Sequence, residues 1–197
     1  MIVHPIVITP NPERWATLAS ALGATVRTHD DGTRLAEFAG GRLSLVSGDS
    51  PSVEFGLEDG ERSGVRGAEG GDGQLGPAVS VAPLLCTPEV EETARILAGQ
   101  GLRRRLTSDS GDWADLAGDG LVGVHVGEVE STVMAFEASD VEALEEPLEQ
   151  SGFRVALVDE AYGRTLRVEH PDDARQESEI WINETQTDTY GYTRHED

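Results

Sequence analysis

Two of the tryptophans and two of the histidines in this sequence could do chemistry at a binding or catalytic site. His125, between two valines, could act as a general base at neutral pH, although a hydrogen-bonded strand histidine is the more common outcome. Trp113 and Trp181 could stack on a flat ligand, or they could pack in the core. His4 could bind a metal ion, or it could be an ordinary histidine near the chain start. These residue types allow base catalysis, aromatic stacking or metal binding.

The basic residues cluster once, in the run Arg103-Arg104-Arg105. On a strand, Arg104 would point away from its two neighbours, and its guanidinium could bind a carboxylate or phosphate through two parallel hydrogen bonds. Such a run can equally pair with the acidic residues around it. Cys86 is the single cysteine, so the chain can form no internal disulfide or multi-cysteine metal site. We expect Cys86 to be buried and inert.

The composition is strongly acidic. The chain has 197 residues and a formal net charge of −22, and all of its 15 basic residues are arginine. A phosphate backbone or an anionic membrane needs a basic footprint, so we expect neither as a partner. The acidic residues are spread along the chain, which indicates a solvated surface and, less often, a cationic ligand. No signal-like segment or long apolar run is present, so we expect a soluble cytoplasmic protein.

The sequence repeats one pattern three times, at roughly 50 residues per copy. Each copy has an apolar strand, a helix that begins at a Pro-Glu or Ser-Asp pair and ends at glycine, and three more short strands. The expected elements are a strand at 4–9, a helix to 23 and strands at 24–28, 33–38 and 42–47; a strand at 81–85, a helix to 101 and strands at 102–107, 112–117 and 121–126; and a strand at 132–137, a helix to 152 and strands at 153–158, 163–169 and 178–183.

The segments between and after the copies divide the chain. Residues 1–59 form one module, and their last part resembles the opening strand of a further copy whose remainder is missing. Residues 60–78 are rich in glycine and charge, which predicts a flexible linker. Residues 79–184 form a complete pair of modules. The tail, 185–197, lacks periodicity, and we expect it to lie on a neighbouring subunit or to lack order.

Three stretches resemble the vicinal oxygen chelate superfamily, which includes glyoxalase I, extradiol dioxygenases, fosfomycin-modifying enzymes and bleomycin-binding resistance proteins. The stretches are the opening His4-x-x-Val7-x-Thr9-x-Asn11-Pro12-Glu13-Arg14, the second-half opening Ala135-Phe136-Glu137 with Asp140-Val141, and the ending His170-Pro171-Asp172 with Ser178-Glu179-Ile180-Trp181-Ile182, which an insertion at 173–177 interrupts. The resemblance implies an α+β fold of repeated βαβββ modules, paired into a curved, half-open barrel.

The resemblance also implies where a metal site would be. Metal enzymes of this superfamily bind a divalent ion in the concave sheet, and the ligand positions of the complete pair fall on or near Val81, His125, Val133 and Trp181. Three of these four side chains cannot bind a metal, and Glu179 would need a two-residue shift. His4 falls on the first-strand ligand position of the N-terminal module, where potential partners are sparse.

These observations favour a metal-independent protein that binds a small organic molecule, with a cation as the favoured charge, in the concave cleft. Trp113, His125, Trp181 and Arg104 are the predicted ligand-binding residues, and we expect no cofactor. The alternatives are a metal-dependent lyase, isomerase or dioxygenase that uses Fe, Mn, Ni or Zn, and a non-catalytic scaffold. Because the odd N-terminal module needs a mate for its sheet, we also expect a homodimer.

Overall fold

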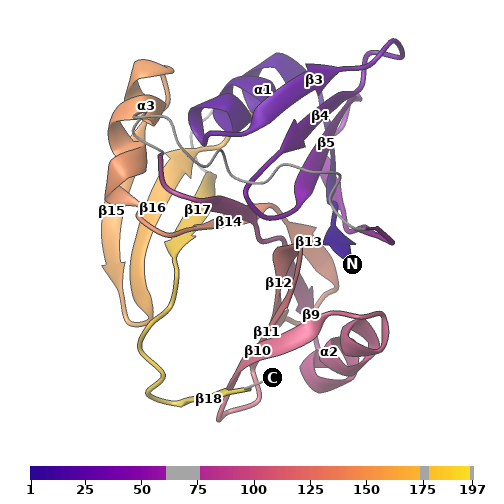
Figure 1. Cartoon of the computed structure of the whole chain (residues 1–197), viewed down its shortest axis with the longest axis vertical. Coiled ribbons are helices and arrows are strands. Elements are labelled where there is room, and N and C mark those ends of the chain that lie inside the picture. The colour runs from indigo at the N-terminus through magenta and orange to yellow at the C-terminus, as the bar shows by residue number, and fades with distance from the viewer. Residues whose placement is uncertain (61–75, 174–177, 196–197) are drawn as a thin grey trace.

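The structure, a computed structural model, describes residues 1–60, 76–173 and 178–195. Three βαβββ modules follow one another along the chain, each with one helix against one face of a mixed sheet (Figure 1). This confirms the predicted α+β fold of repeated βαβββ modules. Most of the predicted linker and insertion, residues 61–75 and 174–177, lies outside the described residues. Within them, no helix is both long and apolar enough to cross a bilayer.

The N-terminal module forms a five-stranded sheet in the order β3-β4-β5-β2-β6. The parallel neighbours β2 and β5 lie at its middle, and the remaining pairs are antiparallel. Its elements are β2 (Ile6–Thr9), α1 (Pro12–Ala21), β3 (Thr25–Thr28), β4 (Arg34–Glu37), β5 (Arg42–Ser47) and β6 (Ser52–Glu54).

The second module forms a six-stranded sheet in the order β13-β9-β12-β11-β10-β18. Its elements are β9 (Leu84–Thr87), α2 (Val90–Gly99), β10 (Arg103–Ser108), β11 (Trp113–Gly118), β12 (Gly120–Val126) and the two edge strands β13 (Ser131–Val133) and β18 (Tyr192–Arg194).

The third module forms a five-stranded sheet in the order β15-β16-β17-β14-β8. Its elements are β8 (Val79–Val81), β14 (Ala135–Ala138), the short helix η1 (Glu142–Leu144), α3 (Glu145–Gln150), β15 (Val155–Glu160), β16 (Gly163–Glu169) and β17 (Glu179–Glu184). Pro147 lies in this last helix, which is shorter than α1 and α2, in agreement with the expected effect of proline.

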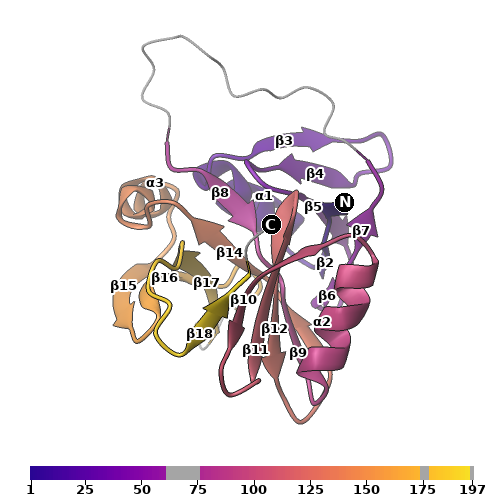
Figure 2. The same cartoon turned by 60° about the horizontal axis from the view of Figure 1, so that its bottom comes forward.

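The second and third modules exchange edge strands. β8 precedes β9 in the chain but pairs with β14 of the third module, and β13 precedes β14 but pairs with β9 of the second. Each exchanged strand ties one sheet to the other, so the two modules form a pair whose sheets face a common cleft. In Figure 2, β18 lies beside β10, between the strands of the third module and those of the second.

The N-terminal module completes its own sheet. β6 pairs antiparallel with β2, as β13 does with β9, and β7 (Leu57–Glu58) pairs with β1 (Ile2–Val3). The stub of a further copy that the sequence indicated is therefore the pair β6 and β7. The edge strand β6 of this sheet therefore comes from the same chain.

Helix starts repeat the same local contact. The amide of Asn11 donates to the hydroxyl of Thr9 at 2.8 Å, and the amide of Glu89 donates to the hydroxyl of Thr87 at 3.2 Å. Each threonine ends the preceding strand and turns the chain into the helix. After α1, Gly23 has φ +84°, a backbone conformation that glycine adopts without strain. The first helix therefore ends at the glycine that the sequence indicated.

One hydrophobic core runs through all three modules, so the N-terminal module is packed against the pair within the chain. At the junction with the third module, the Arg14 guanidinium lies 3.6 Å from the centroid of the Phe153 ring. The indole N–H of Trp15, which is buried, donates to the Asp172 carboxylate at 2.8 Å. A cation–π contact and a hydrogen-bonded indole thus fix α1 against the third module.

The tail differs from the expectation. Residues 192–194 form β18, which extends the second sheet by pairing with β10, and His195 Nε2 lies 2.9 Å from the Thr107 hydroxyl. The chain between β17 and β18 therefore runs from the third module to the second (Figure 1). Pairing of only three residues gives little sequence periodicity, which explains why the pattern did not reveal the strand.

Candidate functional site

The paired sheets of the second and third modules enclose a cavity of about 670 Å³. β12 contributes Gly123 and His125 from one wall, and β17 contributes Glu179, Trp181 and Asn183 from the other. Within each strand these are alternate residues, because successive side chains of a strand point to opposite faces. The cavity therefore lies on the concave side of both sheets, within the size range of small-molecule sites.

Aromatic side chains line both walls. Trp113 and His125 are cross-strand neighbours whose rings meet edge to face, 5.9 Å between centroids. A Cβ at Gly123 would come within 2.8 Å of the Trp113 ring, so glycine makes room for the indole there. On the other wall Trp181 is 42% exposed, which is high for a tryptophan, and the Arg167 guanidinium lies 5.2 Å from its centroid. Both indoles line the cavity.

An arginine joined to two carboxylates lies at the cavity wall. Arg105 donates to Asp115 Oδ2 at 2.9 and 2.6 Å, and to the two carboxylate oxygens of Glu137 at 3.0 and 2.6 Å. Asp115 belongs to β11 and Glu137 to β14, so this cluster links the second module to the third. Thr185 adds a hydrogen bond to Glu137 at 3.1 Å.

Burial dominates the ionisation of Asp115. Its side chain is 9% exposed, and this desolvation raises the pKa of Asp115 to about 6, although the Arg105 charge and hydrogen bonds act in the opposite direction. Burial alone would lower the pKa of Arg105, but the hydrogen bonds and charges of Glu137 and Asp115 outweigh it and raise that pKa. Arg105 therefore stays charged, and Asp115 changes charge near pH 6.

The cavity has an excess of acidic side chains. Among the described residues that line it, Arg105 is the one arginine, and five residues carry carboxylates: Asp112, Asp115, Glu137, Glu179 and Glu184. Arg164 and Arg167, just outside, pair with Glu184 and Glu179. Even when these two are included, carboxylates outnumber guanidinium groups by five to three. The local charge therefore favours a cation over an anion.

Comparison with known proteins identifies the fold. No protein-family model and no curated protein sequence matches the chain. A solved structure of 2,2',3-trihydroxybiphenyl 1,2-dioxygenase from Sphingomonas wittichii strain RW1 is similar, with 10% identity and a TM-score of 0.56 over 94% of this chain and 89% of that one. The chain has the vicinal oxygen chelate fold.

A second similar solved structure is that of a longer protein. It is a xylose isomerase-like TIM barrel/4-hydroxyphenylpyruvate dioxygenase fusion protein, with 10% identity and a TM-score of 0.53 over 95% of this chain. This chain spans 49% of the length of that fusion protein.

The positions that the vicinal oxygen chelate fold implies for a metal do not fit one here. Val81 is buried in the core, while Val133 and Trp181 line the cavity without a metal-binding atom. His125 Nδ1 lies 2.6 Å from the Val126 carbonyl oxygen, and Glu179 pairs with Arg167 at 3.8 Å. In the described part of the chain, no three His, Cys, Asp or Glu side chains are placed to hold an ion together. The residues present therefore do not form a conventional metal site.

Two other candidates lie outside this cavity. Arg104 binds the Glu91 carboxylate on the outer side of the second module, at 2.8 and 2.6 Å, and Arg105 takes the place in the cavity that the sequence suggested for Arg104. The register of β10 shifts between Arg104 and Leu106, and this bulge changes which arginine faces the cleft. His4 contacts Ser44 and Glu58 in the N-terminal module.

Sequence reasoning missed Tyr162 and Tyr192, which also line the cavity. Tyr192 comes from the tail, whose return to β10 no pattern predicted. Cys86, expected to be buried, is half-buried on β9.

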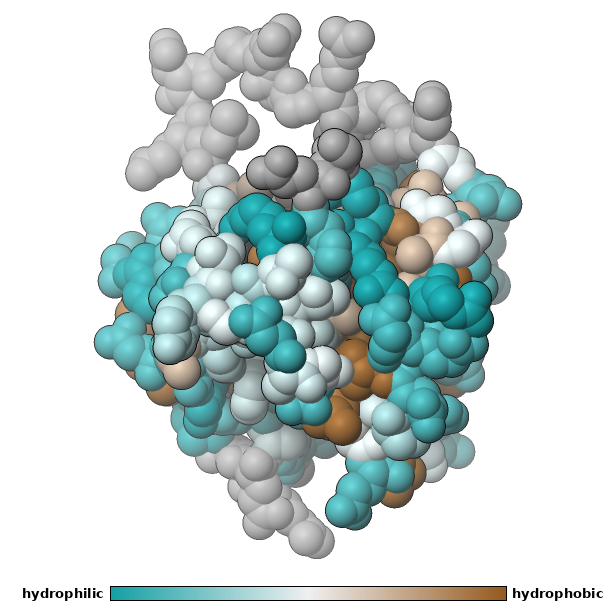
Figure 3. Space-filling view, turned by 90° about the horizontal axis from the view of Figure 1, so that it is seen from below, coloured by the Kyte–Doolittle hydropathy of each residue, from teal (hydrophilic) through white to brown (hydrophobic). Residues whose placement is uncertain are grey.

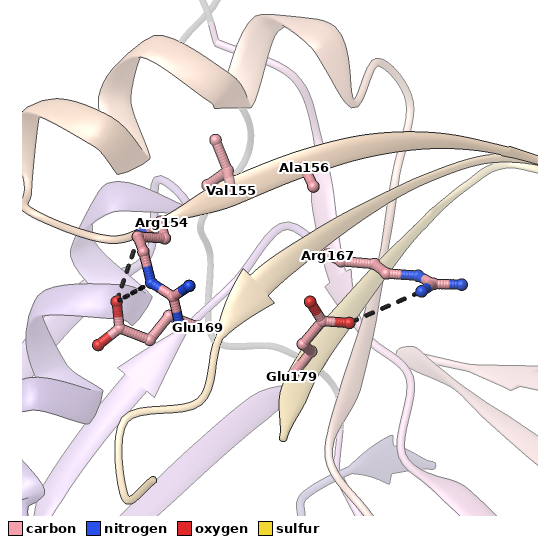
Figure 4. A pocket seen from close by; sticks show the side chains of 6 residues that line it. All are labelled: Arg154, Val155, Ala156, Arg167, Glu169 and Glu179. Atoms are coloured by element: carbon pink, nitrogen blue, oxygen red, sulfur yellow. Dashed lines mark hydrogen bonds and ion pairs between the residues drawn. The ribbon is translucent and has the colours of Figure 1, made fainter. Parts of the chain in front are cut away.

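A second, smaller cleft of about 100 Å³ lies on the third module (Figure 4). Arg154 pairs there with Glu169 at 3.6 Å, and Arg167 pairs with Glu179 at 3.8 Å. Its charged groups pair with one another, and its volume is small for an organic ligand. The large cavity is therefore the better candidate.

On the face seen in Figure 3, hydrophilic residues predominate and apolar residues appear as small patches between them.

Proposed function

We propose that this protein binds a small organic cation with a flat ring in the cleft between its second and third modules, without a metal ion. The observation that carries the proposal is the combination, on the walls of one 670 Å³ cavity, of two indoles with an excess of carboxylates. A flat ring can stack on an indole, and a cation over an indole face gains further attraction. The acidic side chains add a favourable electrostatic field.

Binding of a flat cation should depend on Trp181. We expect 9-aminoacridine, a flat cation, to quench the protein's tryptophan fluorescence, and Trp181→Ala to weaken its binding at least about fivefold, because one stacking contact contributes about 1–3 kcal/mol. The matched control is Tyr190→Ala, which removes a 92% exposed aromatic ring that is not among the residues around the cavity. Equal affinities of the two variants would contradict the proposal.

The affinity for the cation should depend on pH. Because the pKa of Asp115 is raised to about 6, its carboxyl is neutral at pH 5 and charged at pH 7. The additional negative charge should tighten binding of 9-aminoacridine about tenfold across this range, from the Coulomb attraction at partly shielded distances. Fluorescence titration at each pH checks this. In Asp115→Asn the affinity should change less across this range than in the wild type, and a wild-type affinity that falls with rising pH would refute the assignment.

We also propose that the protein is a homodimer, as the sequence led us to expect. β3 is an edge strand of the N-terminal sheet and most of its residues are exposed, so a second chain can pair with this edge. Size-exclusion chromatography with light scattering at micromolar concentration should give twice the chain mass of 21.1 kDa. A mass equal to one chain would contradict this.

A further inference from the structure

We propose that Ser44, His4 and Glu58 form a second site, in the N-terminal module, at which the Ser44 hydroxyl attacks activated acyl esters. His4 Nε2 lies 2.8 Å from Ser44 Oγ, and His4 Nδ1 is hydrogen-bonded to the Glu58 carboxylate. With the proton on Nδ1, that N–H donates to Glu58 and the Ser44 hydroxyl donates to Nε2. A nucleophile bonded to a base, which a third group orients, is the arrangement that activates a serine.

The stub strand gives this arrangement its third member. β7 pairs with β1 so that Glu58 lies opposite Ile2, and the His4 amide donates to the Gly56 carbonyl at 2.9 Å. A Cβ at Gly56 would come within 2.6 Å of the His4 carbonyl oxygen, so the backbones can approach this closely because residue 56 is glycine. The segment that looked like a truncated module thus brings a carboxylate to His4.

The three side chains differ in exposure in a way that suits their roles. The His4 side chain is 13% exposed, Glu58 is 42% exposed, and Ser44 is half-buried in the middle of the sheet. The base is shielded from water, while the nucleophile can still be reached. Ser44 lies between its register partners Ile6 and Leu35, which are half-buried and apolar. An apolar acyl chain is the substrate that this wall would accept.

A positive charge lies on the same strand as the nucleophile. Arg42 lies two residues before Ser44 on β5, so both side chains project from the same face of the sheet. Arg42 Nη1 is 3.2 Å from Glu58 Oε2, which holds the guanidinium next to the His4 pair. A fixed cation at this place would stabilise the negative charge that develops on the substrate's carbonyl oxygen.

The proposed reaction needs no further cofactor. As the bond from Ser44 Oγ to the acyl carbon forms, its proton passes to His4 Nε2 and then to the departing alcohol or phenol. Water then attacks the acyl-serine, His4 accepts the proton of the water, and the carboxylic acid leaves as that proton returns to Ser44 Oγ. The net reaction is ester plus water to acid plus alcohol.

A fluorophosphonate reagent tests the nucleophile directly, because its phosphorus bonds to an activated serine oxygen and fluoride leaves. Intact-protein mass spectrometry with peptide mapping should find one label, on Ser44. Ser44→Ala should take up none. Ser47→Ala, which changes an exposed serine at the end of the same strand, should be labelled like the wild type.

The base is tested by chemical rescue. His4→Gly should be labelled at least about 100-fold more slowly, in line with the usual contribution of a general base, and added imidazole should restore part of the rate. Such rescue would not occur if His4 had a structural role alone. Glu58→Gln, which removes the charge of the positioning residue, should also slow labelling. Thermal unfolding of each variant verifies folding. No label on Ser44 in the folded wild type, or wild-type labelling of His4→Gly, would overturn the proposal.

Discussion

Arg105→Met should destabilise the protein by about 3–5 kcal/mol at pH 7.5, because it leaves two carboxylates without their shared cation in a mostly buried place. Asp115 is buried, and the Glu137 side chain is 15% exposed. Chemical denaturation followed by circular dichroism measures the change in unfolding free energy. Since these carboxylates belong to different modules, the loss of unfolding free energy also measures how strongly the cluster holds the second module to the third.

Arg104→Met is the matched control, since it removes the neighbouring arginine with the same change in shape. Its partner Glu91 has a side chain that is 74% exposed, and an exposed ion pair contributes at most about 1 kcal/mol. The two variants should therefore differ by at least about 2 kcal/mol. Equal losses would contradict the assignment of Arg105 to the buried cluster.

The deficit of Arg105→Met should shrink at low pH. The folded-state pKa of Asp115 is raised above its ordinary value, so the folded protein binds more protons than the unfolded chain between about pH 4 and pH 6. The contribution of Asp115 to stability is therefore present at low pH and is lost as the pH rises through about 6. At pH 5 the protonated carboxyl needs no cation, and the loss in the variant should be smaller than at pH 7.5.

Gly41→Ala should destabilise the protein by about 3 kcal/mol or more, the combined cost of an unfavourable backbone conformation and of overpacking. Gly41 has φ +75°, and an added Cβ would come within 2.3 Å of a Val81 methyl group and 2.8 Å of the Val3 carbonyl oxygen. At this point the turn between β4 and β5 of the N-terminal module contacts β8 and β1. Urea denaturation at neutral pH measures the loss.

Gly32→Ala separates the two causes. Gly32 has φ +85°, but an added Cβ would have no neighbour within 4 Å, so its cost is conformational, about 1–2 kcal/mol. The difference between the variants then reports the packing of the N-terminal module against the pair. If Gly41→Ala were no more harmful than Gly32→Ala, that module would not be packed as the structure shows.

The sequence predicted the repeated elements because their signals are local. Threonine and proline mark the starts of the first two helices, Ser139 and Asp140 mark the start of the third, and glycines at positions 23, 101 and 152 follow the helix ends. Alternation of apolar residues marks the strands. These signals depend on residues that are close in the chain, so they can be recognised without knowledge of the tertiary structure.

The remainder depends on long-range pairing. The exchange of β8 and β13 between sheets, and the return of β18 to β10, are pairings between strands that no local pattern connects. Because of the bulge in β10, Arg105 rather than Arg104 faces the cleft. The position of a bulge depends on the pairing with the strands on both sides. For the same reason the Arg105 cluster and the Ser44–His4–Glu58 arrangement could be recognised only in three dimensions.

Isothermal titration of metal-stripped protein with 9-aminoacridine and with acridine-9-carboxylate tests the proposed cleft function most directly. The two ligands share a flat ring system and differ in charge, so the pair isolates the effect of the acidic walls. We predict that the cation binds at one site per chain, with the same affinity before and after metal removal, and that the carboxylate binds at least about tenfold more weakly. Tighter binding of the carboxylate, or binding that returns only when Fe, Mn, Ni or Zn is restored, would contradict the account.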